Sequence, residues 1–256
     1  MEDMPAKYTK AYPAKKIDVG GKTKLLDIPL ACEAAIEVYL DGKRFTTLLA
    51  SPAEFKELAA GHLVTEGILS FEEISEIEVQ ETRVEVRTKR AEGREGEYLT
   101  PNPLVPNPLT PQAEEKAPYI RQDATFEAKA VFEGREYLES GPYRLSRGTH
   151  LAALVDRNGK LIARSIDVGR HNAVDKIVGK AFLEGLPLSE LYLLSTGRQP
   201  AYMVVKAARA GIPLIVTKAM PLDSGVEAAR KTNMGLVGKL SEDSMLVFAN
   251  DWRIKV

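Results

Sequence analysis

The sequence has little cysteine and little histidine: one cysteine, Cys32, and three histidines among 256 residues. A single cysteine excludes an internal disulfide and every cysteine-rich zinc or iron–sulfur site. It also argues against a zinc-dependent deaminase, whose metal needs a histidine or cysteine plus two further cysteines as ligands. No HExxH-type spacing occurs either, so we predict no metal site.

Excess charge and long apolar runs are also missing. The formal net charge is −1, so no global charge favours nucleic acid or an anionic membrane as a partner. The longest apolar runs are far too short to span a bilayer. The first 16 residues mix charges with two prolines and lack the apolar centre of a signal peptide. We therefore expect a cytoplasmic protein with neither partner, in which any anion binds to a local cluster.

The first half of the chain has the pattern of a small α+β unit. Apolar and polar residues alternate over residues 33–49 on both sides of Asp41-Gly42, a strong β-hairpin signal. Alternation returns at residues 74–86 and predicts two further strands. We place this domain at residues 17–90.

A helix is predicted between the hairpin and those strands. Ser51 and Glu54 have the spacing of a capping box, and Gly67 is placed to end the helix. His62 falls on the apolar face of this helix and is predicted to be a core or interface residue.

Residues 91–119 carry six prolines, a density that neither a helix nor a central strand tolerates. We predict a proline-rich loop or linker over residues 91–124 and a modest helix over residues 125–137. The remaining residues, 125–256, are predicted to form one α/β domain.

Short apolar runs and helical patterns alternate in this second half. A second hairpin is predicted over residues 151–166, turning at Asn158-Gly159. After it, strands are expected near residues 191–194, 212–216, 236–237 and 245–248, with helices after 170, near 202–211 and over 221–231. Strands that alternate with helices imply crossover connections, so the fold class is α/β.

The most informative stretch is the block 167–176, DVGRHNAVDK, at a predicted strand-to-helix turn. Gly169 permits backbone angles that larger residues avoid. A helix start offers unpaired N–H groups and partial positive charge. With Arg170, His171 and Lys176 beside it, this start suits an anion, phosphate above all.

A second turn, Ser195-Thr196-Gly197-Arg198, repeats the order strand, glycine, arginine, helix. In α/β sheets ligands lie beyond the carboxyl ends of the strands. If the two strands are near neighbours, the two arginines converge on a pair of phosphates or one pyrophosphate. Thr149-His150, at the start of a strand, would face the same crevice.

Two simpler interpretations stay open. Arg170 can pair with Asp167 or Asp175 while Arg198 is merely solvated, since glycine-rich turns alone are weak signals. His171 can be a general acid or base, an anion ligand or a packed residue, because the sequence shows no partner nucleophile.

Taken together, these motifs resemble the FdhD family, accessory proteins needed for formate dehydrogenase activity. The matching residues are Gly148-Thr149-His150, Ala152-Ala153, the block 167–176, Ser195-Thr196-Gly197-Arg198, Val205-Lys206-Ala207-Ala208, Gly211-Ile212-Pro213, Leu236-Val237-Gly238, residues 33–40, Ser51-Pro52, Gly61-His62-Leu63 and Glu66-Gly67-Ile68.

The resemblance implies a C-terminal domain similar to cytidine deaminases, a smaller α+β N-terminal domain, and a homodimer. It implies a sulfur carrier that takes persulfide sulfur from a cysteine desulfurase. The acceptor would be the molybdenum bis-guanylyl-pterin cofactor of formate dehydrogenase or a related molybdenum or tungsten enzyme, which a guanine nucleotide mimics in part. The cofactor contacts implied by motif match are Thr149, His150, Asp167, Gly169, Arg170, His171, Lys176, Ser195, Gly197 and Arg198.

The chain departs from the family in its thiols. The family uses a Cys-x-x-Cys loop between the two domains, and that interval contains no cysteine here. Cys32, with no basic neighbour in the local sequence, has the pattern of a small buried hydrophobe. Either Cys32 carries the sulfur, or the chain is a non-catalytic chaperone that binds the nucleotide or cofactor. The turn at residues 239–244, which binds cofactor in the family, is also acidic here.

Overall fold

A computed structural model describes residues 5–89 and 117–256. Most of the predicted proline-rich loop lies outside these residues. Within them, no helix is both long enough and apolar enough to cross a membrane.

A four-stranded sheet forms the small unit, in the order β4-β3-β6-β5. Its strands are β3 (Ala34–Leu40), β4 (Lys43–Ala50), β5 (Ile74–Gln80) and β6 (Arg83–Thr88). The predicted hairpin is confirmed: Asp41 and Gly42 form the turn with φ of 48° and 80°, the left-handed angles that tight hairpin turns require.

The predicted helix is present as α2 (Phe55–Thr65), but the predicted capping box is wrong. Glu54 precedes the helix with a left-handed φ of 57° and no side-chain cap bond. Ser51 lies further from the helix start, and its hydroxyl accepts the N–H of Val168 instead. A long-range partner has replaced the local one.

A six-stranded sheet forms the larger unit, in the order β13-β12-β11-β10-β8-β9. Its strands are β8 (His150–Val155), β9 (Leu161–Asp167), β10 (Tyr192–Ser195), β11 (Leu214–Thr217), β12 (Gly235–Gly238) and β13 (Leu246–Ala249). Strands β10, β11 and β12 are parallel, whereas β8 and β13 pair antiparallel to their neighbours. The fold is therefore mixed α/β, as predicted.

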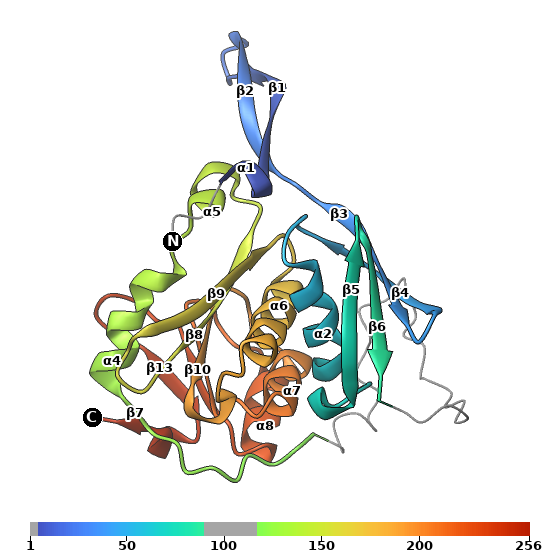
Figure 1. The fold of residues 1–256 in the computed structure, drawn as a ribbon. Helices are drawn as coiled ribbons and strands as arrows, with labels where there is room; N and C mark the ends of the chain where they lie inside the picture. Colours follow the sequence, from blue (N-terminus) through green and yellow to red (C-terminus); the bar gives the residue numbers. More distant parts are fainter. Residues whose placement is uncertain (1–4, 90–116) are drawn as a thin grey trace.

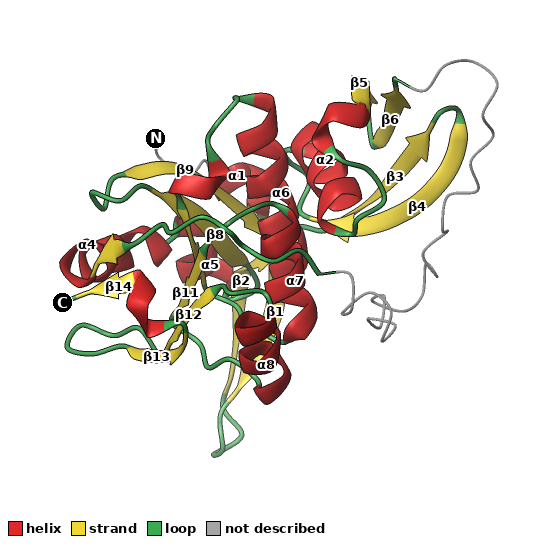
Figure 2. Cartoon of the chain, turned by 90° about the horizontal axis from the view of Figure 1, so that it is seen from below, coloured by secondary structure: helices red, strands yellow, loops and turns green. Residues whose placement is uncertain are grey.

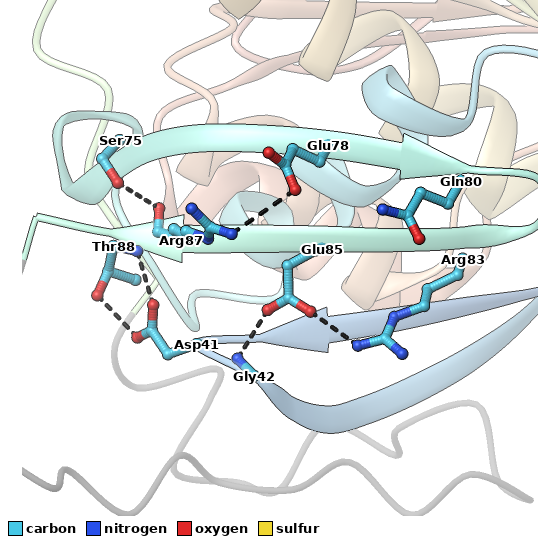
Figure 3. Close-up of a pocket in the computed structure, with 9 residues that line it drawn as sticks. All are labelled: Asp41, Gly42, Ser75, Glu78, Gln80, Arg83, Glu85, Arg87 and Thr88. Atoms are coloured by element: carbon cyan, nitrogen blue, oxygen red, sulfur yellow. Dashed lines mark hydrogen bonds and ion pairs between the residues drawn. The ribbon is translucent and has the colours of Figure 1, made fainter.

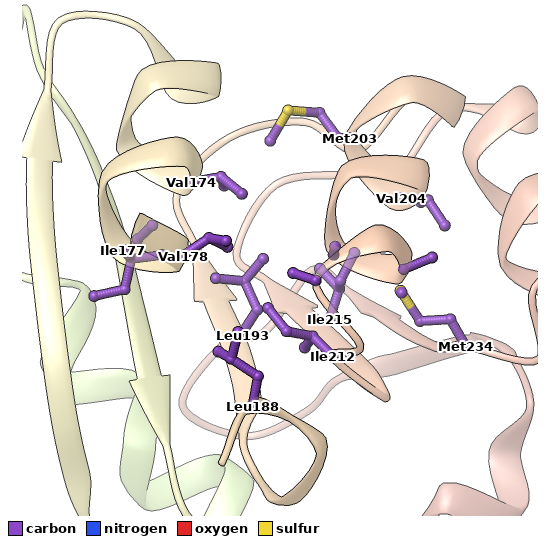
Figure 4. Packing of buried hydrophobic residues seen from close by; sticks show 14 of the residues in the cluster. Val174, Ile177, Val178, Leu188, Leu193, Met203, Val204, Ile212, Ile215 and Met234 are labelled. Carbon is purple, nitrogen blue, oxygen red and sulfur yellow. The ribbon is translucent and has the colours of Figure 1, made fainter. Parts of the chain in front are cut away.

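Helices α6 (Arg170–Leu183), α7 (Ala201–Arg209) and α8 (Asp223–Lys231) pack on one face of this sheet (Figures 1 and 2). Figure 4 shows the core between them, where Val174 and Ile177 of α6 meet Leu193 and Ile215 of the sheet. Burial of such apolar side chains is the main favourable term in folding.

The opposite face is covered by β7 (Phe126–Glu127), α4 (Ala128–Glu133), the 3-10 helix η2 (Gly134–Leu138) and β14 (Ile254–Lys255). The single helix predicted over residues 125–137 is thus wrong at both ends. Its first residues pair as a strand with β14. Its last turn tightens at Gly134, which lies against the Tyr192 ring, and glycine weakens a helix interior.

A hairpin near the N-terminus was not predicted from the sequence. After α1 (Pro5–Tyr8), strands β1 (Thr9–Ile17) and β2 (Thr23–Ala31) pair antiparallel and project from the body (Figure 1). We call residues 9–31 the arm. Within the described residues, the arm meets the body at α5 (Gly141–Ser146). Short 3-10 helices complete the chain: η1 (Phe71–Glu73), η3 (Leu188–Glu190) and η4 (Asp251–Arg253).

The two sheets are joined through a close crossing of α2 and α6. A Cβ atom on Gly61 would overlap the carbonyl oxygen of Asp175, and one on Gly179 would overlap that of Glu57. The two backbones therefore touch directly. Because the other side of α2 packs on the small sheet through residues such as Leu58, α2 lies buried between the two sheets.

Gly61→Ala is expected to destabilise the protein, because the new methyl group must push two helices apart. Overpacking of this kind costs about 1–3 kcal/mol, measurable as a lower free energy of unfolding in urea. Gly20→Ala, in the exposed turn of the arm, is the control, since its Cβ meets only the Asp18 carboxylate at 3.4 Å. Equal stability of the two variants would contradict the crossing described here.

Candidate functional site

The strand register gathers the predicted site residues at one edge of the large sheet. His150 lies opposite Asp167, Ala152 opposite Ser195, and Ser195 opposite Thr217. Because β8 runs antiparallel to β9 and β10, it begins where those strands end. Strand β8 separates β9 from β10, so the two strands that precede the glycine–arginine turns are not direct neighbours.

The two turns nevertheless touch. Gly197 is buried, and a Cβ atom there would lie 2.8 Å from Cβ and 3.0 Å from Cδ of Arg170. The Arg170 side chain therefore lies directly on Gly197. A larger residue at position 197 would displace it, which gives this glycine a steric role.

Arg170 pairs with neither carboxylate that the sequence offered it. Its Nη2 donates to the Tyr202 hydroxyl at 2.6 Å, and the same hydroxyl lies 2.6 Å from Nε2 of His171. Asp167 and Asp175 are instead engaged by lysines. The Arg170 charge is thus left for a further partner. Arg198 is exposed, which is compatible with both interpretations of this side chain.

Asp167 and Lys176 lie behind the first turn. Both side chains are 0% exposed, and Lys176 Nζ is 2.7 Å from Asp167 Oδ2. Asp167 accepts the N–H groups of Gly169 and Ser51, and Lys176 donates to the Ser51 carbonyl oxygen. This pair fixes the turn to the segment before α2 and does not reach the surface.

A second buried charge cluster lies deeper along α6. Lys206 Nζ is 2.8 Å from Asp175 and 2.6 Å from Glu66, and His62 Nδ1 is 3.1 Å from Asp175. Burial alone would raise the pKa of Asp175, but Lys206 and His62 outweigh it and hold that pKa well below its usual range. His62 is thus an interface residue, as predicted, and the cluster ties α2, α6 and α7 together.

The two histidines at the sheet edge are neutral near pH 7. Burial, followed by the charge of Arg170, lowers the pKa of His171 to about 4. The same two causes, in the same order, lower the pKa of His150, whose Nδ1 lies 3.3 Å from the Thr196 hydroxyl. Both rings are therefore hydrogen-bonding groups and not cations.

Two buried polar atoms of predicted site residues have no partner among the described residues: Arg170 Nε and Thr149 Oγ1. Buried polar atoms are nearly always hydrogen-bonded, so a water or a ligand would complete the bonding of these two. The helix start adds donors, since Gly169 at the N-cap of α6 offers no side chain to bond the first N–H groups.

The acidic turn at residues 239–244 starts at the same edge. The N–H of Leu240 donates to the Thr217 carbonyl oxygen, and Glu242 pairs with Arg135 at 3.2 Å. Part of the acidity of this turn is thus neutralised within the protein.

A polar hollow on the small sheet is a poor candidate for the site (Figure 3). Its charged groups already have partners within the hollow: Glu85 pairs with Arg83, Arg87 pairs with Glu78, and Asp41 accepts from the Thr88 hydroxyl. Within the described ranges, no three side chains of histidine, cysteine, aspartate or glutamate gather as a metal site would need.

The FdhD/NarQ family model matches residues 31–255 of this chain. The chain belongs to the FdhD/NarQ family. The FdhD match includes the sheet edge, both glycine–arginine turns and the buried clusters behind them.

Named relatives agree. A sulfur carrier protein FdhD from Streptomyces avermitilis is 33% identical over 249 residues, covering 88% of each chain. One from Methanothermobacter thermautotrophicus is 29% identical over 222 residues, covering 86% of this chain and 88% of its own. A crystal structure from Desulfotalea psychrophila, described as a formate dehydrogenase accessory protein, superposes with a TM-score of 0.82 at 26% identity, covering 97% of this chain and all of that one. The likeness to cytidine deaminases stays a prediction.

Cys32, the single thiol of this FdhD chain, follows a residue that packs against the segment leading into the site. It follows β2, is half-buried, and its N–H donates to the Tyr8 carbonyl oxygen at 2.8 Å. The residue before it, Ala31, lies against Gly148, since a Cβ there would be 3.0 Å from the Ala31 Cβ. Gly148 directly precedes Thr149, so the segment that carries the thiol contacts the segment that leads into the site.

Two residues that shape this site were not predicted from the sequence. Tyr202 falls at the start of the helix predicted near residues 202–211, and the only signal of its role is its hydroxyl group. Ser51 was assigned to a helix cap, and no local signal pointed to Asp167, 116 residues away.

His171 is expected to make stability depend on pH. Its folded pKa of about 4 lies below its ordinary value of 6.5, so between these values the unfolded chain binds a proton that the folded protein refuses. The contribution of His171 to the free energy of unfolding should therefore be fully present above pH 6.5 and be lost as the pH drops toward 4. His171→Gln should remove this part of the loss in urea unfolding at pH 7 and 5. The same loss in both proteins would contradict a neutral His171.

Proposed function

We propose that this chain assists maturation of formate dehydrogenase or a related molybdenum or tungsten enzyme by binding a bis-guanylyl-pterin cofactor at the sheet edge. One observation carries the proposal. The two glycine–arginine turns meet at Arg170 and Gly197, and the Arg170 charge is not neutralised by a carboxylate there.

The residues present fit the phosphate end of such a cofactor. The start of α6, Arg170 and Arg198 supply donors and positive charge, and His150, His171 and Thr149 supply neutral polar groups. Gly197, which has no side chain, leaves room for the Arg170 side chain that lies on it. The two turns would be held in place by buried residues that do not touch the ligand: Asp167 and Lys176 at the first turn and Ser195 at the second. When bound, the metal of the cofactor would supply the redox chemistry of the client enzyme.

Guanosine diphosphate is the simplest probe of this site. Arg170→Ala is expected to weaken its binding about tenfold or more in calorimetry, because a hydrogen bond to a charged group contributes about 1.5–3 kcal/mol. Arg44→Ala, an exposed arginine on the small sheet, should bind like the parent. Equal affinities of the Arg170→Ala variant and the parent would place the nucleotide elsewhere.

We further propose that Cys32 carries sulfur, as the name of the relatives indicates for them. The thiolate would attack the outer sulfur of a desulfurase persulfide, forming the Cys32 persulfide and releasing the desulfurase thiolate. The second candidate is a non-catalytic cofactor chaperone, favoured by the lack of any Cys-x-x-Cys in the sequence.

Radioactive sulfur separates the two candidates. After incubation with a cysteine desulfurase and labelled cysteine, the parent chain is expected to hold label that dithiothreitol releases, and Cys32→Ala should hold none. If the parent chain stays unlabelled but still binds guanosine diphosphate, sulfur carriage by Cys32 is rejected and the cofactor-chaperone function is favoured.

We also propose a cytoplasmic homodimer in which the arm contacts a second copy. Tyr12, Leu25 and Leu30 expose 47%, 77% and 47% of their surface there, and a two-stranded ribbon alone is marginal in water. The arm has five lysines and two aspartates in a chain of net charge −1, so the remaining surface is acidic and attracts it. Sedimentation velocity measures this state.

A further inference from the structure

The hydroxyl of Tyr202 lies between two side chains of the proposed site. It is 2.6 Å from Arg170 Nη2 and 2.6 Å from His171 Nε2, and the rings of Tyr202 and His171 lie 4.7 Å apart. Tyr202 belongs to the first turn of α7, whereas the other two begin α6. The contact therefore spans the two helix starts.

The donors of this contact can be assigned. A guanidinium can only donate, so the Tyr202 oxygen accepts from Arg170. The hydroxyl proton needs an acceptor, and among the described residues the single candidate within hydrogen-bond distance is His171 Nε2. The positive charge on Arg170 polarises the hydroxyl and strengthens that donation.

A neutral imidazole that accepts at Nε2 carries its proton at Nδ1. That N–H has no hydrogen-bond partner in the described part of the chain, and the side chain is partly exposed. His171 thus offers a fixed donor beside the Arg170 guanidinium. With Nε2 occupied, a role as general base through that nitrogen is removed.

We propose that Tyr202 is a positioning residue that locks His171 in the Nδ1–H tautomer and aims Arg170, so that both donate to a fully ionised phosphate group. This inference rests on the proposed function and adds a statement about ligand specificity to it. A site lined by donors accepts phosphate oxygens that carry no proton and discriminates against a ligand that must itself donate there.

The tautomer can be read directly without any ligand. Nitrogen-15 NMR of histidine-labelled protein at pH 7 distinguishes the two ring nitrogens, and His171→Gln assigns the signals among three histidines. The parent is expected to show Nδ1–H at His171. Tyr202→Phe should shift His171 toward the Nε2–H form that free imidazole side chains prefer in water. Tyr137→Phe, which removes a hydroxyl bonded to the Gly159 carbonyl oxygen, should change nothing.

Calorimetry gives the second readout. Tyr202→Phe should weaken the binding of guanosine diphosphate about threefold to tenfold. Tyr137→Phe should bind it as the parent does. An Nε2–H tautomer in the parent, or an unchanged tautomer in Tyr202→Phe, would overturn the inference. Failure of the parent to bind guanosine diphosphate would instead overturn the proposed function, so the two failures are distinguishable.

Discussion

The backbone contact between α2 and α6 at Gly61 and Gly179 is the constraint on which the rest of the structure depends. It allows groups from the small unit to reach two lysines buried behind the sheet edge. Lys176 meets the Ser51 carbonyl oxygen, and Lys206 meets Glu66. A buried ion that loses its partner costs several kcal/mol, so these contacts hold the two units in one arrangement.

The same clusters explain why Arg170 is not neutralised by the acidic residues near it in the chain. One helix, α6, carries both half-buried and fully buried charges. Its one carboxylate, Asp175, and Asp167 just before the helix are both paired with buried lysines. Arg170, at the start of the helix, therefore forms no ion pair with either of these carboxylates. The separation follows from helical geometry, because Arg170 and Lys176 lie more than one turn apart along the axis.

Much of the fold was predictable because its signals are local. Asp41-Gly42 specified a hairpin turn through backbone angles, and the block 167–176 marked a helix start next to a strand end. Partners across the chain were not predictable. Ser51 has the spacing of a cap, yet its bonds go to a turn more than a hundred residues away. Tyr202 fits an apolar face, and only the packing of α6 against α7 shows what its hydroxyl meets.

The burial of the Asp167–Lys176 pair has a consequence for behaviour in salt. Both side chains are 0% exposed, and mobile ions screen buried pairs far less than exposed ones. Concentrated salt should therefore leave the turn held by this pair intact while it weakens the attraction of Arg170 and Arg198 for an anion. Ionic strength would then change the affinity for a charged ligand without changing the stability of the fold.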